Sequence, residues 1–146
     1  ELGLKALEFM NQGILVPDEI TIGMLRHKVE SIQGVAGFIY DGFPRTIPQA
    51  QALDAMLAEK GEAIHQLIAL EVSDDEIVKR ILNRGQSSGR ADDNDEEIIR
   101  KRMDEYRKKT SEVYNYYQGF NKSTLINGEG SIDEIFDGLC SVMDQC

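Results

Sequence analysis

The sequence has 146 residues, a length suited to one domain with a sizeable core. Apolar residues make up 41% and charged residues 29%, which is typical of a soluble globular protein. The net charge of -10 argues against a general nucleic-acid-binding protein, because such proteins need a basic surface to neutralise phosphates. The sequence has no apolar run long enough to span a bilayer and no signal-peptide pattern, so no membrane partner is expected.

The positive charge is concentrated in one part of the chain. Ten of the sixteen Lys and Arg residues lie between Lys79 and Lys109, which leaves room for a local anion site within an acidic protein. The two cysteines, Cys140 and Cys146, lack the spacing of metal ligands. We therefore expect reduced thiols and a cytoplasmic location, with Cys140 on the apolar, core-facing side of a helix.

The first part of the chain predicts two helices, a strand and a third helix. A helical pattern covers residues 2–10 and ends at Gly13, and Pro17 is placed to open a second helix that ends near Ser31. Residues 37–40 read as a buried strand. The sequence Thr46-Ile47-Pro48-Gln49 matches a capping box and predicts a helix over residues 47–60.

The second part continues this alternation. We expect a buried strand at residues 64–72, a helix that begins with a capping box at 73–82 and a polar loop at 83–95. A long helix at 96–118, a short strand at 123–126 and a final capped helix at 131–144 follow. Strands that alternate with helices predict an α/β domain built on a parallel sheet.

The first predicted strand ends in the polar sequence "DGFPR" at residues 41–45. Ligands of open α/β sheets bind beyond the carboxyl ends of the strands. Gly42 permits a close backbone approach, and Pro44 stiffens the turn. Asp41 could order a hydrated Mg²⁺, and the planar fork of Arg45 suits a phosphate. A polar surface loop is an equally weighted alternative on these residues alone.

A set of arginines forms the second candidate site. Arg80 and Arg84 are four residues apart and share a helix face, and Arg90, Arg100 and Arg102 follow. Converging arginines suit phosphoryl transfer, in which charge spreads over the transferring oxygens. A solvated charged face is the alternative, and we prefer it for four residues: Lys101, Arg107, Lys108 and Lys109. Arg100 and Arg102 lie on different faces of their helix, so one of the two is expected to point inward.

Four segments, in order, resemble motifs of the adenylate kinases. "YDGFPRTIPQA" resembles their signature segment, and "GILVPDE" the segment that lines the AMP adenine. "RILNRGQSSGRADDNDEEIIRKRMDEY" resembles the lid region of the short-lid members, and "NGEGSIDEIF" the stretch before the last helix. The resemblance covers nearly all 146 residues.

This resemblance implies an α/β fold, namely a P-loop NTPase-like parallel sheet flanked by helices, incomplete at the N-terminus and with a short lid loop. It further implies a single truncated kinase domain over 1–146, with 1–33 in the AMP-binding helical region and 84–94 as the lid loop. The implied reaction is ATP + AMP = 2 ADP with Mg²⁺ as cofactor. The implied protein is cytoplasmic and, when intact, a monomer.

Site roles are also implied by the resemblance. Arg84 matches the lid arginine that holds the ATP phosphates, and Arg80 matches a position near them. Arg45, Arg90 and Arg102 match arginines that touch the AMP phosphate or the transferring group, and the motif "RKRMDEY" favours Arg102 over Arg100.

The two bases and the metal have their own implied residues. Gln49 matches the residue that reads the AMP adenine, although the capping box gives it an alternative role. The remaining AMP residues are Ile14, Leu15, Val16, Gly42, Phe43 and Pro44. Gly130 would approach the ATP adenine through its backbone or form a plain turn, and Asp41 would reach Mg²⁺ through water. Asp92 and Asp93 either pair with lid arginines on closure or begin the next helix.

The phosphate loop G-x-x-x-x-G-K-[ST] is not in this sequence. We therefore expect the C-terminal three-quarters of an adenylate kinase, inactive alone, whose preceding part is cleaved, omitted, disordered or replaced by another chain. Two alternatives remain: a UMP/CMP-type nucleoside monophosphate kinase and a non-catalytic nucleotide-binding fragment. Gln49 and "ILVPDE" favour AMP over the pyrimidine nucleotides.

Overall fold

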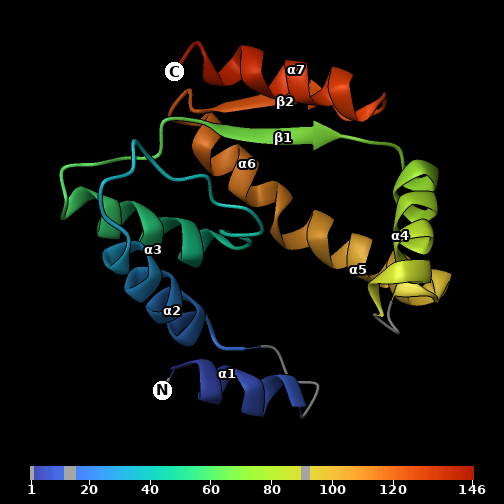
Figure 1. Cartoon of the computed structure of the whole chain (residues 1–146), viewed down its shortest axis with the longest axis horizontal. Helices are drawn as coiled ribbons and strands as arrows, with labels where there is room; N and C mark the ends of the chain where they lie inside the picture. The colour runs from blue at the N-terminus through green and yellow to red at the C-terminus, as the bar shows by residue number, and fades with distance from the viewer. Residues whose placement is uncertain (1, 12–15, 90–92) are drawn as a thin grey trace. The chain divides into compact units, whose positions relative to one another are not determined.

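The computed structural model describes residues 2–11, 16–89 and 93–146. Within these ranges the elements, shown in Figure 1, are α1 (Leu2–Asn11), α2 (Asp18–Ser31), α3 (Ile47–Ala58), β1 (Leu67–Glu71), α4 (Asp74–Ser88), α5 (Glu96–Lys109), α6 (Ser111–Gln118), β2 (Ser123–Asn127) and α7 (Ile132–Met143). They form two compact units, residues 1–63 and 64–146.

The first unit is a packing of α1 on α2 and of α2 on α3. Helix α2 follows Pro17 and carries Asp18 and Glu19 in its first turn, where negative charge stabilises the helix. Helix α3 begins at Thr46, whose hydroxyl accepts a hydrogen bond from the Gln49 amide nitrogen at 3.3 Å. Where burial is described in this unit, outside residues 1 and 7–15, the buried apolar residues are Ala6, Val29, Ala50, Leu53, Met56 and Leu57. The three predicted helices are confirmed, whereas Gly13 lies outside the described residues.

The predicted strand at residues 37–40 is wrong. Residues 32–46 contain neither helix nor strand, and Ile39 is 80% exposed. A strand needs a neighbouring strand for its backbone hydrogen bonds, and the described residues of the first unit contain none. The apolar run instead contributes packing through its aromatic rings, because those of Phe38 and Tyr40 stack at 6.1 Å.

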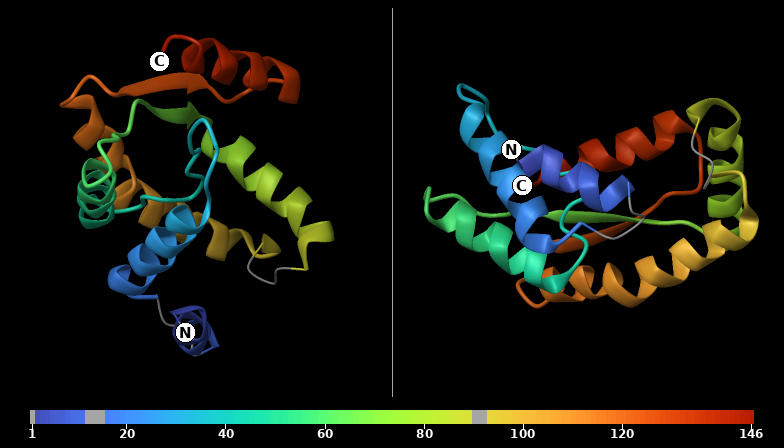
Figure 2. Two further views of the ribbon diagram at one scale, coloured as in Figure 1. Left: turned by 60° about the vertical axis from the view of Figure 1, so that its left-hand side comes forward. Right: turned by 90° about the horizontal axis from the view of Figure 1, so that it is seen from below.

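The second unit contains the parallel sheet that the sequence predicts. Strands β1 and β2 pair from Leu67 opposite Ser123 to Glu71 opposite Asn127. Helix α7 runs alongside β2 in both views of Figure 2, and α6 contacts both strands. Val113 and Tyr117 of α6 are almost completely buried.

Two predicted helix boundaries differ from the structure. Helix α4 continues to Ser88, six residues beyond its predicted end, and stops at Gly89 in the left-handed conformation. The predicted loop at 83–95 is therefore helical at its start. The predicted helix at 96–118 is divided at Thr110 into α5 and α6.

The predicted caps have mixed outcomes. Ser131 and Glu134 form the expected capping box at the start of α7, with hydrogen bonds of 3.2 and 2.8 Å. Ser73 precedes α4, but its side chain makes no capping bond, and the Glu76 side chain accepts from Arg80 and not from the Ser73 backbone. The core position expected for Cys140 is wrong: α7 has no buried residue and Cys140 is half-buried.

An apolar cluster joins the two helices that carry most of the arginines. Val78 of α4 and Ile99 and Met103 of α5 are its buried members, and Ile77, Ile81 and Leu82 pack against it. The cluster fixes α4 against α5, and it therefore also fixes the arginines that project from these helices.

Ile99→Ala should destabilise the protein by about 2–5 kcal/mol, because it removes a fully buried side chain from this cluster and leaves a cavity. The matched control is Ile98→Ala on the same helix, where the side chain is 40% exposed and the loss should be much smaller. Chemical denaturation measures both. Equal losses for the two variants would contradict the packing described.

Candidate functional site

A buried carboxylate joins two of the predicted site arginines. Asp93 is fully buried and accepts two hydrogen bonds from Arg84, at 2.8 and 2.9 Å, and one from Arg102 at 3.0 Å. The hydroxyl of Ser88 adds a further bond at 3.3 Å. The Arg84 hydrogen bonds, with help from Arg102, lower the pKa of Asp93 to about 2 against the opposing effect of burial. The carboxylate is therefore ionised at neutral pH and holds both guanidinium groups.

Local sequence explains how Asp93 reaches this place. Gly85 lies on α4 next to Arg84, and a Cβ atom there would stand 2.5 Å from the Asn94 side chain and 2.8 Å from the Asp93 carbonyl oxygen. Any larger residue would push this segment away from α4. Asp95, not Asp93, caps α5 by accepting hydrogen bonds from the backbone of Glu97 and Ile98.

These contacts separate alternatives that the sequence left open. Asp93 pairs with arginines and does not begin α5, while Asp92 lies outside the described residues. Arg102 points to the same carboxylate as Arg84, whereas Arg100 bonds to Glu96 at 2.8 Å. This difference favours Arg102 as the arginine that belongs with Arg84.

A cavity of about 440 Å³ lies between the start of α4 and the loop after β2. It is lined by Ser73, Asp75, Glu76, Lys79, Arg80, Glu129 and Gly130. The structure thus brings Arg80 and Gly130, both predicted for ATP, to one cavity at the carboxyl ends of two parallel strands. This is where α/β sheets bind ligands.

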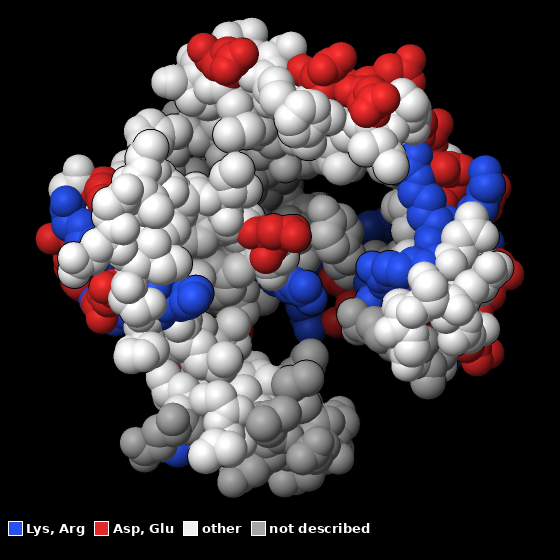
Figure 3. Space-filling view, in the orientation of Figure 1, with Lys and Arg blue, Asp and Glu red and all other residues white. Residues whose placement is uncertain are grey.

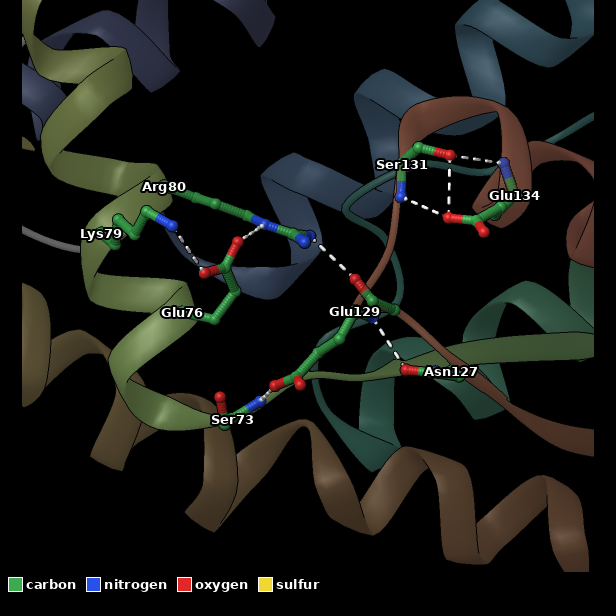
Figure 4. A network of polar contacts seen from close by, with 9 residues as sticks. Ser73, Glu76, Lys79, Arg80, Asn127, Glu129, Ser131 and Glu134 are labelled. Carbon is green, nitrogen blue, oxygen red and sulfur yellow. Dashed lines mark hydrogen bonds and ion pairs between the residues drawn. The ribbon is translucent and has the colours of Figure 1, made fainter.

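Polar contacts hold the walls of this cavity, as Figure 4 shows. Arg80 donates to Glu76 at 2.7 Å and to the Gly128 carbonyl oxygen at 2.9 Å. Glu129 accepts from the Ser73 backbone at 2.6 Å and so ties the loop after β2 to the start of α4. Hydrogen bonds from Arg80 and Lys79 lower the pKa of Glu76, and those from Ser73 lower the pKa of Glu129.

Opposite charges gather over different helices of this unit. Figure 3 shows basic side chains over α4 and acidic ones over α7. The basic group over α4 includes Lys79, Arg80 and Arg84, of which the first two reach the cavity. The cavity is thus lined by both signs of charge: Lys79 and Arg80 can contact an anion, and the carboxylates of Asp75, Glu76 and Glu129 lie beside them.

In the first unit, the "DGFPR" segment folds back on itself. Gly42 adopts a φ of +74°, and its carbonyl oxygen accepts a hydrogen bond from Arg45 Nε at 2.8 Å. The Phe43–Pro44 peptide bond is cis. Asp41 is exposed. The loop thus positions the Arg45 guanidinium through its own backbone.

Gln49 is buried at the start of α3, with 8% of its surface exposed. Its Oε1 accepts from the Arg45 backbone nitrogen at 2.8 Å, and its Nε2 donates to Asp18 Oδ1 at 2.7 Å. The predicted capping box is therefore half formed: Thr46 caps Gln49, but the Gln49 side chain bonds to Arg45 and not to Thr46.

The other predicted residues are placed as follows. Val16 is half-buried just before Pro17 and α2. Phe43 and Pro44 are half-buried in the loop before α3. Three predicted residues, Ile14, Leu15 and Arg90, lie outside the described residues.

Sequence reasoning missed three acidic partners of the site: Asp18, Glu76 and Glu129. The spacing of Glu76 and Arg80 matches the i,i+4 pairs of helices and could have revealed their contact. Asp18 and Gln49 are separated by 31 positions, and Ser73 and Glu129 by 56, so no local pattern marks these pairs.

Among the residues that the structure describes, there is no helix long and apolar enough to cross a membrane. None of their His, Cys, Asp and Glu side chains form a group of three that could hold a metal ion. Both Cys140 and Cys146 are free thiols.

A parallel sheet with a cavity beyond its strand ends, lined in part by Lys79 and Arg80, and a pair of arginines held by Asp93 define an α/β protein suited to phosphate-bearing ligands. The sequence profile of the adenylate kinases matches residues 1–122. Adenylate kinases from Flavobacterium psychrophilum and Flavobacterium johnsoniae are each 48% identical over 99% of this chain and 76% of their own length. The adenylate kinase of Bacteroides fragilis is 44% identical over the same shares. The chain belongs to the adenylate kinase family, and its function is that of a nucleotide-binding phosphotransferase, a nucleoside monophosphate kinase.

The low pKa of Asp93 predicts a specific loss of stability in acid. Between about pH 4 and pH 2 the unfolded chain binds a proton at Asp93 that the folded chain does not, so the free energy of unfolding should fall as the pH falls. Asp93→Asn should be less stable at pH 7 and should lose less over this range. Urea titrations at several pH values measure this, with Asp104→Asn as a control for the change in net charge. Parallel pH curves for the wild type and Asp93→Asn would contradict the assignment.

Proposed function

We propose that this protein catalyses the reversible transfer of a phosphoryl group from ATP to AMP, which yields two molecules of ADP. The observation that carries the proposal is the shared Asp93 carboxylate, which gathers Arg84 and Arg102 from two helices. Gathered arginines can stabilise the charge that spreads over the transferring oxygens. The comparisons do not favour the UMP/CMP kinase alternative.

The cavity of the second unit is proposed to receive the ATP base. Gly130 is exposed at its edge, so its backbone is accessible to a ligand. Arg80 stands in the same wall and can stack its planar guanidinium on a base or contact a phosphate. Arg84 lies one helical turn further along α4, in the direction in which the phosphates of ATP would extend.

The first unit is proposed to receive AMP. Gln49 has a donor and an acceptor with which to read the adenine edge, and Arg45 presents its fork to the phosphate. Val16, together with Ile14 and Leu15, would line the base, while Gly42, Phe43 and Pro44 shape the loop that carries Arg45.

The catalytic contribution of these residues is proposed to be electrostatic. The proposed catalytic residues would each offset charge on the transferring group, and they are Arg45, Arg84, Arg90 and Arg102. Before a nucleotide binds, the ion pairs with Asp93 hold the guanidinium groups of Arg84 and Arg102 close to one another. A nucleotide phosphate then competes with Asp93 for arginines that are already near one another.

The chemistry of the first-unit loop fits Mg²⁺ held through water. Mg²⁺ usually takes one or two carboxylates, with waters and substrate phosphates as its other ligands, so a cage of three side chains is not required. The exposed carboxylate of Asp41 would accept hydrogen bonds from that water shell. When bound, the ion neutralises phosphate charge. We further propose that the protein acts as a monomer in the cytoplasm.

Substrate choice tests the function directly. With ATP as the donor, the protein expressed from its complete reading frame should phosphorylate AMP in preference to CMP and UMP, because the adenine edge matches the Gln49 amide, whereas uracil reverses the order of donor and acceptor and cytosine carries the matching groups on a smaller ring. A coupled assay for ADP measures the three rates. Equal or higher rates with CMP or UMP would reject the assignment in favour of a pyrimidine nucleotide kinase.

Arg84→Ala should lower kcat by about 10²-fold, because it removes a donor from the developing charge. Lys108→Ala is the matched control, since it removes one positive charge from an exposed position of α5 and should keep the wild-type rate. The same assay measures both variants, and thermal unfolding checks that both are folded. A wild-type kcat in Arg84→Ala would remove Arg84 from the catalytic set.

A further inference from the structure

The carboxylate of Asp18 holds the amide of Gln49 in one orientation. Gln49 Nε2 donates to Asp18 Oδ1 at 2.7 Å, while Gln49 Oε1 accepts from the Arg45 backbone nitrogen at 2.8 Å. The other carboxylate oxygen, Oδ2, accepts a hydrogen bond from the Thr46 hydroxyl at 3.4 Å. Asp18 is thus tied to the residue that begins α3 as well as to the Gln49 side chain.

The chemistry of these partners prevents the amide from turning over. An ionised carboxylate only accepts hydrogen bonds, and a backbone N–H only donates them. Rotating the Gln49 amide by half a turn would place Oε1 against the Asp18 carboxylate and Nε2 against the Arg45 N–H. Both hydrogen bonds would be lost together, in a side chain that is 8% exposed and has little access to water.

Asp18 is free to play this part because it is not needed as a cap. Helix α2 has Pro17 at its N-cap and no side-chain capping bond. Asp18 and Glu19 both place negative charge in the first turn, where it favours the helix. Of these two acids, Asp18 is the one that bonds to Gln49, so a variant of Glu19 is a matched control for a variant of Asp18.

The fixed amide still has groups left for a ligand. Nε2 keeps a second hydrogen and Oε1 a second lone pair, so Gln49 can present one donor and one acceptor in a set order. Adenine offers an amino donor at position 6 beside the N1 acceptor. A 6-oxopurine such as hypoxanthine offers the reverse, an acceptor at position 6 beside a donor at N1. A fixed amide distinguishes these edges, whereas an amide that can turn over accommodates either.

We propose that Asp18 is a positioning residue that determines base specificity, by locking the Gln49 amide in the orientation that accepts 6-aminopurine and rejects 6-oxopurine nucleotides. The proposal rests on the proposed function in one respect, that Gln49 meets the base of the nucleoside monophosphate. Asp18 itself need not touch the nucleotide.

The test compares AMP with inosine monophosphate, which differs from it only at this edge. In Asp18→Asn the new amide can donate or accept, so only the Arg45 N–H still sets the orientation of the Gln49 amide, and with one of the two restraints lost the ratio of kcat/KM for AMP to that for inosine monophosphate should fall by about tenfold. Glu19→Gln removes the same charge from the same helical turn and should keep the wild-type ratio. An unchanged ratio in Asp18→Asn would overturn the proposal, because the loss of a merely structural contact would lower kcat/KM for both substrates by the same factor.

A second measurement needs no nucleotide. In ¹⁵N-labelled protein the side-chain NH₂ signal of Gln49, assigned by its absence in Gln49→Leu, should have one proton shifted by the bond to Asp18. That shift should become smaller in Asp18→Asn, where a neutral amide replaces the charged acceptor, and should be kept in Glu19→Gln; an unchanged shift in Asp18→Asn would also overturn the proposal. Were Asp18→Asn to unfold, as judged by circular dichroism, Asp18→Ser takes its place, because a hydroxyl likewise donates and accepts.

The two measurements separate the possible failures. A wild-type protein that phosphorylates neither AMP nor inosine monophosphate contradicts the proposed function, and the NH₂ signal then decides whether Asp18 locks Gln49. A wild-type protein that prefers AMP while Asp18→Asn keeps that preference upholds the function and rejects the role of Asp18.

Discussion

The ionised carboxylate of Asp93 is the interaction on which the arginine-bearing part of the molecule depends. A fully buried carboxylate is tolerated only where charged donors compensate for the loss of water, and Arg84 and Arg102 provide that compensation. Removing either arginine would leave a buried charge with fewer partners. The ion cluster is therefore both a structural joint between α4 and the segment before α5 and a store of positive charge for a ligand.

Apolar packing and the ion cluster support one another. The cluster of Val78, Ile99 and Met103 sets the contact between α4 and α5, and Gly85 lets the Asp93 segment approach α4 closely. Without that close approach the carboxylate would not reach Arg84. The position of the arginines thus depends on the absence of a side chain at Gly85 as much as on charge. Packing determines where the electrostatic attraction can act.

The sequence predicts the helices and the parallel pair of strands because local signals carry them. Ser131 and Glu134 form a capping box within four residues, and the apolar runs of β1 and β2 are followed by caps. The strand expected at residues 37–40 fails because a strand is defined by a partner, and an apolar run such as "FIY" does not specify one. Likewise, α4 continues to Ser88 although residues 83–88 have the polar composition of a loop.

The residues of the candidate site are likewise predicted only in part from the sequence. Motif resemblance predicts Arg80, Gly130 and Gln49, and the structure describes the first two at one cavity and the third in a buried network. Asp18 and Glu129 could not be predicted as partners, because their contacts join positions far apart in the chain, whereas Glu76 lies one helical turn from Arg80 and its contact is visible in the sequence. Side-chain type and spacing indicate which groups are able to bind. They do not indicate which neighbour fixes the direction in which a group binds.

Asp93 and Asp18 share one physical property, which is that an ionised carboxylate accepts hydrogen bonds and never donates them. Beside Gln49, a hydroxyl or an amide could satisfy the amide group in either orientation, whereas the Asp18 carboxylate leaves it one choice, with its NH₂ group toward Asp18. Beside Arg84, which can only donate, the Asp93 carboxylate holds the guanidinium through its charge and two hydrogen bonds. In each case the acid fixes a second residue that is equipped to bind a nucleotide, one at the phosphates and one at the base. Specificity in such a site then resides partly in residues that make no contact with the ligand.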